Sequence, residues 1–323
     1  MRAVMCRELG EPELLLLEQL DTEPCPPDRV RVHIWASGLN YVDALFVQGK
    51  YQIRPQLPFI PGSEIAGEIT ELGEQVQGFT VGNRVFASIG IGGFADEVVL
   101  SPSQIIPIPD RLSFAQAATM TQSYATAWYS LTQRTQLLPE EWVVVLGAGG
   151  GVGLAMIDVA RAHGAKVIAV ASTSEKLQLC IERGAHGVID SSTEDVKTRI
   201  RELTEGGADI VIDPVGGSLA ELALRALREN GRYLVIGFAS GVIPDLPANQ
   251  ILLRNRHVIG VDWGAWAMTN PGENATLLGE VIAAVEDGSI TPIEPHLYPL
   301  AEASTALRDL LDRRLVGKAC LSS

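Results

Sequence analysis

The chain has 323 residues, and its 25 Lys and Arg against 39 Asp and Glu give a formal net charge of −14. This length is typical of two domains. The acidic excess argues against a nucleic-acid binder and against binding to an anionic membrane, because both need clustered positive charge. A hydrophobic content of 46% predicts a folded globular protein with a sizeable core.

The first hundred residues consist of short alternating apolar runs interrupted by Pro and Gly. The runs are Val30–Ile34, Ile65–Ile69, Arg84–Phe86 and Glu97–Leu100. This rhythm predicts a compact β-rich unit of short strands.

From Trp142 onward, apolar runs alternate with helical patterns as far as Ile236. The expected strands are Trp142–Leu146, Val167–Ala171, His186–Ile189, Asp209–Asp213 and Arg232–Ile236. The expected helices are Val152–His163, Lys176–Arg183, Asp195–Leu203 and Leu219–Glu229. Such alternation predicts βαβ units and a parallel sheet covered on both faces. After Pro247 it fades, and the last segment is too small for its own core, so we expect it to pack on the N-terminal unit.

A glycine-rich turn joins the first of these strands to its helix, in the run Leu146-Gly-Ala-Gly-Gly-Gly-Val-Gly153. Glycines are needed where the turn is tight and the backbone approaches a pyrophosphate, which then lies at the positive end of the helix. A strict GxGxxG register does not fit, because Ala148 stands where the first Gly belongs. The predicted cofactor-binding residues of the turn are Ala148, Gly150, Gly151, Val152 and Gly153. A turn that binds nothing is the alternative; a Walker-type loop is excluded, since no Lys-Ser or Lys-Thr follows.

The tip of the second strand favours NADP(H) over NAD(H). It reads Ala171-Ser-Thr-Ser-Glu-Lys176 and lacks the acid that accepts a hydrogen bond from a ribose hydroxyl in NAD-binding chains. Ser172 can donate to a 2′-phosphate and Lys176 can supply a positive charge. Glu175 counts against this hypothesis, and a hydroxyl that merely caps the next helix is the alternative.

Two further positions follow later strands of the sheet. The run Asp213-Pro-Val-Gly-Gly-Ser218 resembles the surroundings of a serine nucleophile, but the closing glycine is absent, and we interpret Gly216 as part of a cofactor-facing loop. Phe238 lies beyond the fifth strand, where a nicotinamide can bind; a core aromatic is the alternative.

With these residues in view, the chain resembles the medium-chain dehydrogenase/reductase superfamily, and within it the zinc-free NADPH:quinone oxidoreductases. The resemblance extends over the whole length. Its carriers are Gly38-Leu-Asn-Tyr-Val-Asp43, Gln48-Gly-Lys-Tyr51, Pro58-Phe-Ile-Pro-Gly-Ser-Glu-Ile-Ala-Gly67, Val81-Gly-Asn-Arg-Val85, the glycine turn, Asp213-Pro-Val-Gly-Gly217 and Gly317-Lys318. It implies an α/β protein: a GroES-like β-rich catalytic domain from residues 1–122 and 256–323, and a doubly wound Rossmann domain at 123–255.

The residues at the zinc-ligand positions of the superfamily argue against a metal. Asn40 and Ser63 stand there, and neither is a useful Zn²⁺ ligand. The four cysteines, Cys6, Cys25, Cys180 and Cys320, form no Cys-x-x-Cys pair, which disfavours both a structural zinc site and a disulfide framework. No signal peptide or membrane span is recognisable, so we expect a soluble, cytoplasmic protein.

The resemblance implies hydride transfer from NADPH to a quinone or related conjugated carbonyl. Tyr51 is the expected proton donor, because related 2-enoyl thioester reductases use a Tyr in a similar Gln-Gly-x-Tyr run. Asn40, Tyr41 and Asp43 are expected to line the cleft, and Thr126 and Lys318 to contact the cofactor. Half-buried tyrosines without a catalytic role, and a helix cap at Asp43, are the alternatives.

Two other functions stay open. An enoyl-CoA reductase is suggested by Tyr51, and a non-catalytic NADPH-binding protein with a structural or sensing role, as in some relatives, is the other alternative. The resemblance also implies a homodimer formed through residues 242–264. Many quinone reductases have a Tyr after the third strand where this chain has Ser191, so Ser172 and Lys176 are left to hold the phosphate.

Overall fold

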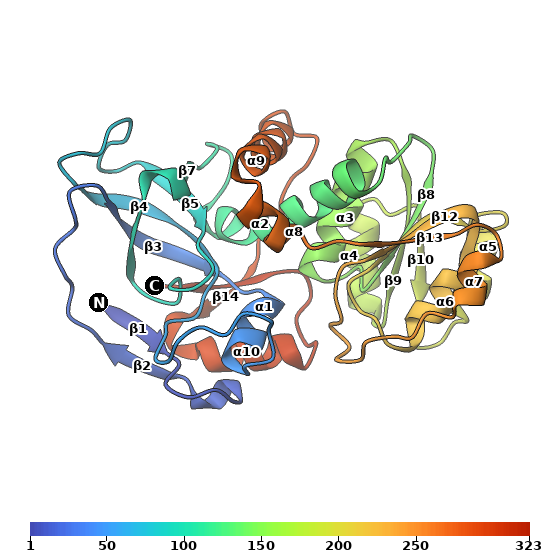
Figure 1. Cartoon of the computed structure of the whole chain (residues 1–323), viewed down its shortest axis with the longest axis horizontal. Helices are drawn as coiled ribbons and strands as arrows, with labels where there is room; N and C mark the ends of the chain where they lie inside the picture. The colour runs from blue at the N-terminus through green and yellow to red at the C-terminus, as the bar shows by residue number, and fades with distance from the viewer. The chain divides into compact units, whose positions relative to one another are not determined.

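The computed structural model describes all residues, Met1–Ser323. The chain forms two compact units, and each is described by itself (Figure 1). Unit 1 comprises Met1–Gln122 and Pro292–Ser323, and unit 2 comprises Ser123–Thr291. Unit 1 is therefore interrupted by unit 2. No helix is long and apolar enough to cross a membrane.

Unit 1 is built on a mostly antiparallel sheet. Its path is β14-β15-β3-β4-β5-β7, and β6 also pairs with β3. The strands are β3 (Val30–Gly38), β4 (Glu64–Leu72), β5 (Arg84–Ser88), β6 (Glu97–Leu100), β7 (Ile106–Pro107), β14 (His296–Pro299) and β15 (Ala319–Ser322). A separate ribbon consists of β1 (Arg2–Met5) and β2 (Leu16–Gln19). Because β15 pairs with β3, the last residues of the chain complete the sheet begun by the first forty.

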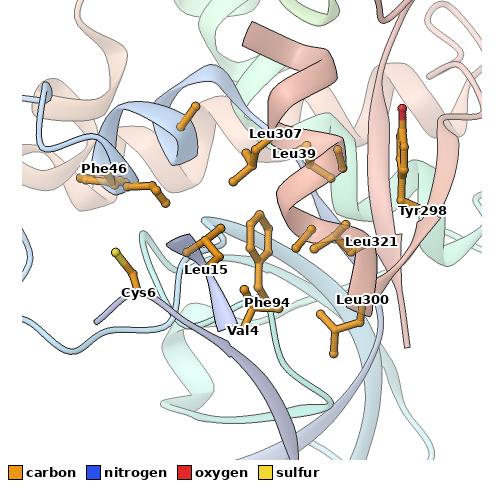
Figure 2. Close-up of a cluster of buried hydrophobic side chains, with 14 of the residues drawn as sticks. Val4, Cys6, Leu15, Leu39, Phe46, Phe94, Tyr298, Leu300, Leu307 and Leu321 are labelled. Carbon is orange, nitrogen blue, oxygen red and sulfur yellow. The ribbon is translucent and has the colours of Figure 1, made fainter. Parts of the chain in front are cut away.

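The helices of unit 1 enclose a core that both ends of the chain supply. They are α1 (Tyr41–Val47), α10 (Ala303–Leu311), the first part of α2 (Phe114–Trp128), and the 3₁₀ segments η1 (Pro12–Leu14), η2 (Pro102–Gln104) and η4 (Leu300–Glu302). Figure 2 shows Phe94 packed among Val4, Leu15 and Leu321 in this core. Neither end buries these side chains alone, which explains why the domain is discontinuous.

Unit 2 is a six-stranded sheet whose neighbouring strands are all parallel, in the order β10-β9-β8-β11-β12-β13. The strands are β8 (Trp142–Leu146), β9 (Lys166–Ala171), β10 (Gly187–Asp190), β11 (Ala208–Asp213), β12 (Leu227–Val235) and β13 (His257–Gly260). The order reverses at β8, the place where doubly wound sheets bind their ligands.

Helices cover both faces of the parallel sheet, as the alternating pattern predicts. They are α3 (Gly151–Ala162), α4 (Ser174–Glu182), α5 (Val196–Leu203), α6 (Ser218–Ala226), α7 (Ala248–Leu252), α8 (Trp263–Thr269) and α9 (Pro271–Glu286), with a π-helical segment at Tyr129–Arg134 after α2. Figure 1 shows α3 and α4 on one side of the sheet and α5 and α6 on the other. Residues 143–146 of β8 are fully buried, so the turn that follows them stands on a rigid support.

The expected second boundary at residue 256 lies too early in the chain. β13 pairs in parallel with β12, with Val258 opposite Tyr233, so it is a sixth strand of the unit 2 sheet. Residues 256–291 therefore belong to unit 2. The strand has only four residues and follows a short helix, α7, so the alternating pattern is not recognisable in the sequence after Pro247.

Candidate functional site

The glycine turn of unit 2 connects β8 to α3 and leaves no room for a Cβ atom at Gly147, Gly149 or Gly153. Gly147 has a φ of 60°, and Gly150 is the N-cap of α3. A Cβ atom on Gly153 would lie 2.6 Å from both the Cα of Ala148 and the carbonyl oxygen of Gly147. The backbone N–H groups and the positive dipole end of α3 are thus open to a negative group. The structure places all five predicted turn residues together in an arrangement that suits a pyrophosphate.

Lys176 lies beside this turn. A Cβ atom on Gly149 would come within 2.6 Å of the Lys176 Cβ and within 2.7 Å of its Cγ, so the lysine stem occupies the space left by that glycine. Thr173 is the N-cap of α4 and accepts a hydrogen bond from the backbone N–H of Lys176. Ser172 is exposed at the end of β9. The capping alternative is therefore correct for Thr173, and the structure also places the Lys176 side chain at the glycine turn.

The loop after β11 is held by its own buried aspartate. The Asp213 carboxylate accepts hydrogen bonds of 2.8 Å from the N–H groups of both Val215 and Gly216, and another from the Tyr233 hydroxyl. Gly216 has a φ of 68°, and a Cβ there would lie 3.1 Å from the Phe238 ring. Gly216 and Phe238 are thus neighbours, as two contributors to one cofactor-facing surface should be.

Ser218, the residue of the serine-nucleophile alternative, has no general base beside it. Ser218 is the first residue of α6, and no histidine or carboxylate is hydrogen-bonded to it. A hydrolytic serine needs such a partner to lose its proton. The geometry therefore favours a structural role for this residue.

Unit 1 contains a buried cluster around Asn40, the N-cap of α1. The Asn40 carboxamide donates to the Glu64 carboxylate at 2.7 Å and accepts from the Lys318 ammonium at 2.7 Å. Lys318 also donates to the Leu39 carbonyl at 3.1 Å. The Asn40 backbone N–H donates to Asp43 at 2.8 Å, which closes a capping box. Both ends of the Asn40 amide are thus committed inside the protein.

Two more side chains complete the cluster. Gln122 donates its backbone N–H to the second oxygen of Glu64 and its amide to the Ser63 hydroxyl, both at 2.7 Å. Ser63 in turn lies 3.4 Å from the Asn40 amide nitrogen. Asn40 and Ser63, which match the zinc-ligand positions of the superfamily, therefore lie side by side, Asn40 held by Glu64 and Lys318 and Ser63 by Gln122.

Burial dominates the electrostatics of this cluster. It raises the pKa of Asp43 to about 7, against hydrogen bonds from Ser63 and Asn40 that favour the carboxylate. Burial also raises the pKa of Glu64 and lowers that of Lys318, while the mutual attraction of Glu64 and Lys318 opposes both shifts. Burial works against the charged form of all three groups, and the Asn40 amide links the Glu64 carboxylate to the Lys318 ammonium.

The remaining predicted residues lie apart from this cluster. Tyr51 follows α1, and its ring packs edge-on against Phe46 with the centroids 5.0 Å apart. Tyr41 is the half-buried first residue of α1, and Thr126 lies half-buried on α2 in unit 2. Lys318 was expected to contact the cofactor; that contact stays a prediction, and the structure places its ammonium among unit 1 groups.

Sequence reasoning missed Glu64 and Gln122 as members of the cluster. Glu64 stood in the Gly62-Ser63-Glu64 run that carried the resemblance, so a signal existed, whereas nothing marks Gln122. No group of three or more His, Cys, Asp or Glu side chains lies close enough to hold a metal ion.

Comparison with known proteins agrees with this geometry. Residues 26–110 match the family model of the alcohol dehydrogenase GroES-like domain, and residues 151–278 match that of zinc-binding dehydrogenases. A quinone oxidoreductase-like protein 2 homolog of Nematostella vectensis is 38% identical over 100% of this chain and 89% of its own. The crystal structure of Escherichia coli quinone oxidoreductase complexed with NADPH is 26% identical, covers both chains fully and superposes with a TM-score of 0.90.

Proposed function

Because the chain belongs to the quinone oxidoreductase family of the medium-chain dehydrogenase/reductase superfamily, we propose that it reduces quinones or related conjugated carbonyls with NADPH and without zinc. It is an enzyme of the medium-chain reductase type. The observation that carries the proposal is the position of Lys176 over a glycine turn at the start of α3.

The glycine turn and Lys176 bind different phosphate groups of the cofactor. The N–H groups at the start of α3 bind the pyrophosphate, and Gly153 keeps the helix close enough to the strand for this contact. Lys176 and Ser172 bind the 2′-phosphate, since no acid at the end of β9 repels it. When bound, NADPH supplies the hydride that reduces the substrate.

Unit 1 supplies the proton and the electrostatic setting. Tyr51 holds a phenolic O–H that can be donated to the reduced substrate. Glu64 and Lys318 are hydrogen-bonded to the two ends of the Asn40 amide, so the orientation of this amide is fixed. A conjugated carbonyl delocalises the incoming charge itself, so the chain needs no Lewis acid at this point.

Coenzyme preference tests the binding proposal. We expect Lys176→Ala to raise KM for NADPH by about tenfold or more and to leave KM for NADH nearly unchanged, because only NADPH carries the 2′-phosphate. Lys197→Ala, which removes a lysine from α5, is the matched control and should change neither. Equal losses with both coenzymes would contradict the role given to Lys176.

Substrate choice tests the reaction. Metal-free enzyme should oxidise NADPH with ortho- or para-quinones or with enones. Replacement of Tyr51 by Phe should lower kcat by about a hundredfold or more for a substrate that needs a proton from this group. Faster turnover of a short enoyl-CoA than of any quinone would favour the thioester reductase, and NADPH binding without any turnover would favour a non-catalytic role.

We also propose that the protein is a cytoplasmic homodimer. All four cysteines are free, as a reducing compartment favours. β13 is an edge strand of the parallel sheet and its Val258 is exposed, as are Val242 and Ile243 earlier in the chain. A monomer mass by light scattering would contradict the dimer.

A further inference from the structure

Four arginines of unit 2 gather at the C-terminal end of α6. They are Arg201, Arg225, Arg254 and Arg256. Arg201 donates to the carbonyl oxygen of Arg225 at 2.8 Å, and Arg256 donates to the same oxygen at 3.2 Å. Two guanidinium groups therefore share one acceptor, which places two positive charges side by side.

Only one arginine of this group has a carboxylate partner. Arg225 pairs with Glu221 at 3.2 Å, but no carboxylate forms an ion pair with Arg201, Arg254 or Arg256. The nearby acids are engaged elsewhere, Glu202 with Arg199 and Glu229 with Asn255. The end of a helix offers only about half a negative charge, which is too little to balance three guanidinium groups.

The protein also leaves part of these side chains without hydrogen bonds. The Nε atoms of Arg201 and Arg256 are buried and have no partner, and they are two of the five such side-chain atoms in the chain. Burial, followed by the charges of Arg254, Arg201 and Arg225, lowers the pKa of Arg256. Unbalanced positive charge is unexpected in a chain with 39 acidic and 25 basic residues, which has ample carboxylates to pair it.

Arg254 brings a free guanidinium to the surface of the group. Its side chain is exposed and makes no hydrogen bond, while its backbone carbonyl accepts from Asn230 at 2.8 Å. Its φ is 82° and that of Asn255 is 51°, a left-handed conformation that costs roughly 1 kcal/mol or more for such residues. The loop before β13 thus keeps Arg254 at this place despite strain.

The group lies far from the cofactor turn along the strands. In a parallel sheet, helices run back from the carboxyl edge of the strands to the amino edge. Arg201 lies in the last turn of α5, Arg225 in the last turn of α6, and Arg256 directly before β13. All three therefore lie at the amino edge of the sheet, whereas the glycine turn lies at its carboxyl edge.

We propose that Arg201, Arg225 and Arg254 form a second binding site, for a phosphate-type oxyanion, with Arg256 adding buried positive charge. The planar guanidinium donates two parallel hydrogen bonds and matches the geometry of such an anion. Inorganic phosphate and the phosphoryl group of a small metabolite share this chemistry.

Equilibrium dialysis of inorganic phosphate against the purified full-length protein, at constant ionic strength in sodium chloride, tests the site. Arg254→Gln should weaken binding about tenfold, and it should fold normally because the side chain makes no bond in the native state. Arg54→Gln removes an exposed arginine from unit 1 and is the control for net charge. Saturating NADPH should not displace phosphate from this site, whereas it would displace phosphate from the glycine turn.

Several results would overturn the proposal. One is wild-type protein that retains no phosphate at about 10 mM, a weak-binding limit for a charged site. Another is Arg254→Gln that binds as tightly as wild type. Competition by a phosphorylated metabolite but not by sulfate would identify the phosphoryl group as the source. A variant that changes the mass in light scattering and leaves phosphate binding intact would instead assign the arginines to a contact between copies of the chain.

Discussion

Asp43 should make the stability of the protein depend on pH in an unusual direction. Burial raises its pKa from 3.8 to about 7, so the folded protein binds this proton more tightly than the unfolded chain does. The stabilisation is complete below about pH 4 and is lost as the pH rises through about 7. Most paired carboxylates behave in the opposite way.

The size of the effect follows from the shift. One pKa unit corresponds to about 1.4 kcal/mol, so a shift of roughly three units is worth about 4 kcal/mol at full protonation. Integrated between pH 5 and pH 8, the contribution falls by about 2.5 kcal/mol. Glu64, Lys318 and the Ser63 hydroxyl face Asp43 and set how much of this range is realised.

Urea unfolding of wild type and Asp43→Asn at pH 5, 6, 7 and 8 measures the effect. The asparagine keeps an acceptor for the Asn40 N–H but does not titrate, so wild type minus variant should fall by about 2.5 kcal/mol across this range. Asp195→Asn is the control, because Asp195 also caps a helix, and the Thr198 hydroxyl and N–H lower its pKa. Its difference should change in the opposite direction and at lower pH. A flat or rising difference for Asp43→Asn would refute the reasoning.

The remaining predictions concern unit 2. Arg183→Met should lower the free energy of unfolding by about 3–5 kcal/mol in urea, because Arg183 pairs with the buried Asp158, which also accepts from Tyr124. Arg199→Met breaks two solvent-accessible pairs, with Glu194 and Glu202, and should cost under about 1 kcal/mol. Gly153→Ala should raise the dissociation constant for NADPH in a fluorescence titration by about tenfold or more, since its Cβ would meet backbone at 2.6 Å. Gly279→Ala in α9 meets nothing within 4 Å and should raise thermal stability, by about 0.5–1 kcal/mol. Unchanged NADPH affinity in Gly153→Ala, or a destabilised Gly279→Ala, would contradict the respective argument.

The parallel sheet and its glycine turn could be predicted from the sequence because their signals are local. A buried strand, a run of glycines and an apolar helix follow one another within about twenty residues. The Thr173 cap and Lys176 could also be predicted from local sequence, because both follow the end of β9 within about one helical turn. The C-terminal boundary of unit 2 could not be predicted, because β13 is short and no local sequence pattern indicates that it pairs with β12.

The unit 1 cluster shows what local patterns cannot predict. Asn40 and Lys318 are 278 positions apart, and they meet because β15 pairs with β3 so that Cys320 lies opposite Gly38. The backbone N–H of Leu39 then donates to Ala319 at 2.9 Å, which fixes Lys318 beside Asn40. Strand register decides this contact, and register depends on the packing of the whole core.

The match to a family model named for zinc-binding dehydrogenases does not bear on the metal. That match covers residues 151–278, all of which lie in unit 2, whereas the positions of the superfamily's zinc ligands lie in unit 1. There, Asn40 and Ser63 offer a carboxamide and a hydroxyl, and the Lys318 ammonium is already hydrogen-bonded to Asn40. A fixed positive charge next to two weak donors opposes the binding of a divalent cation. The family model therefore matches a part of the chain that contains none of these positions.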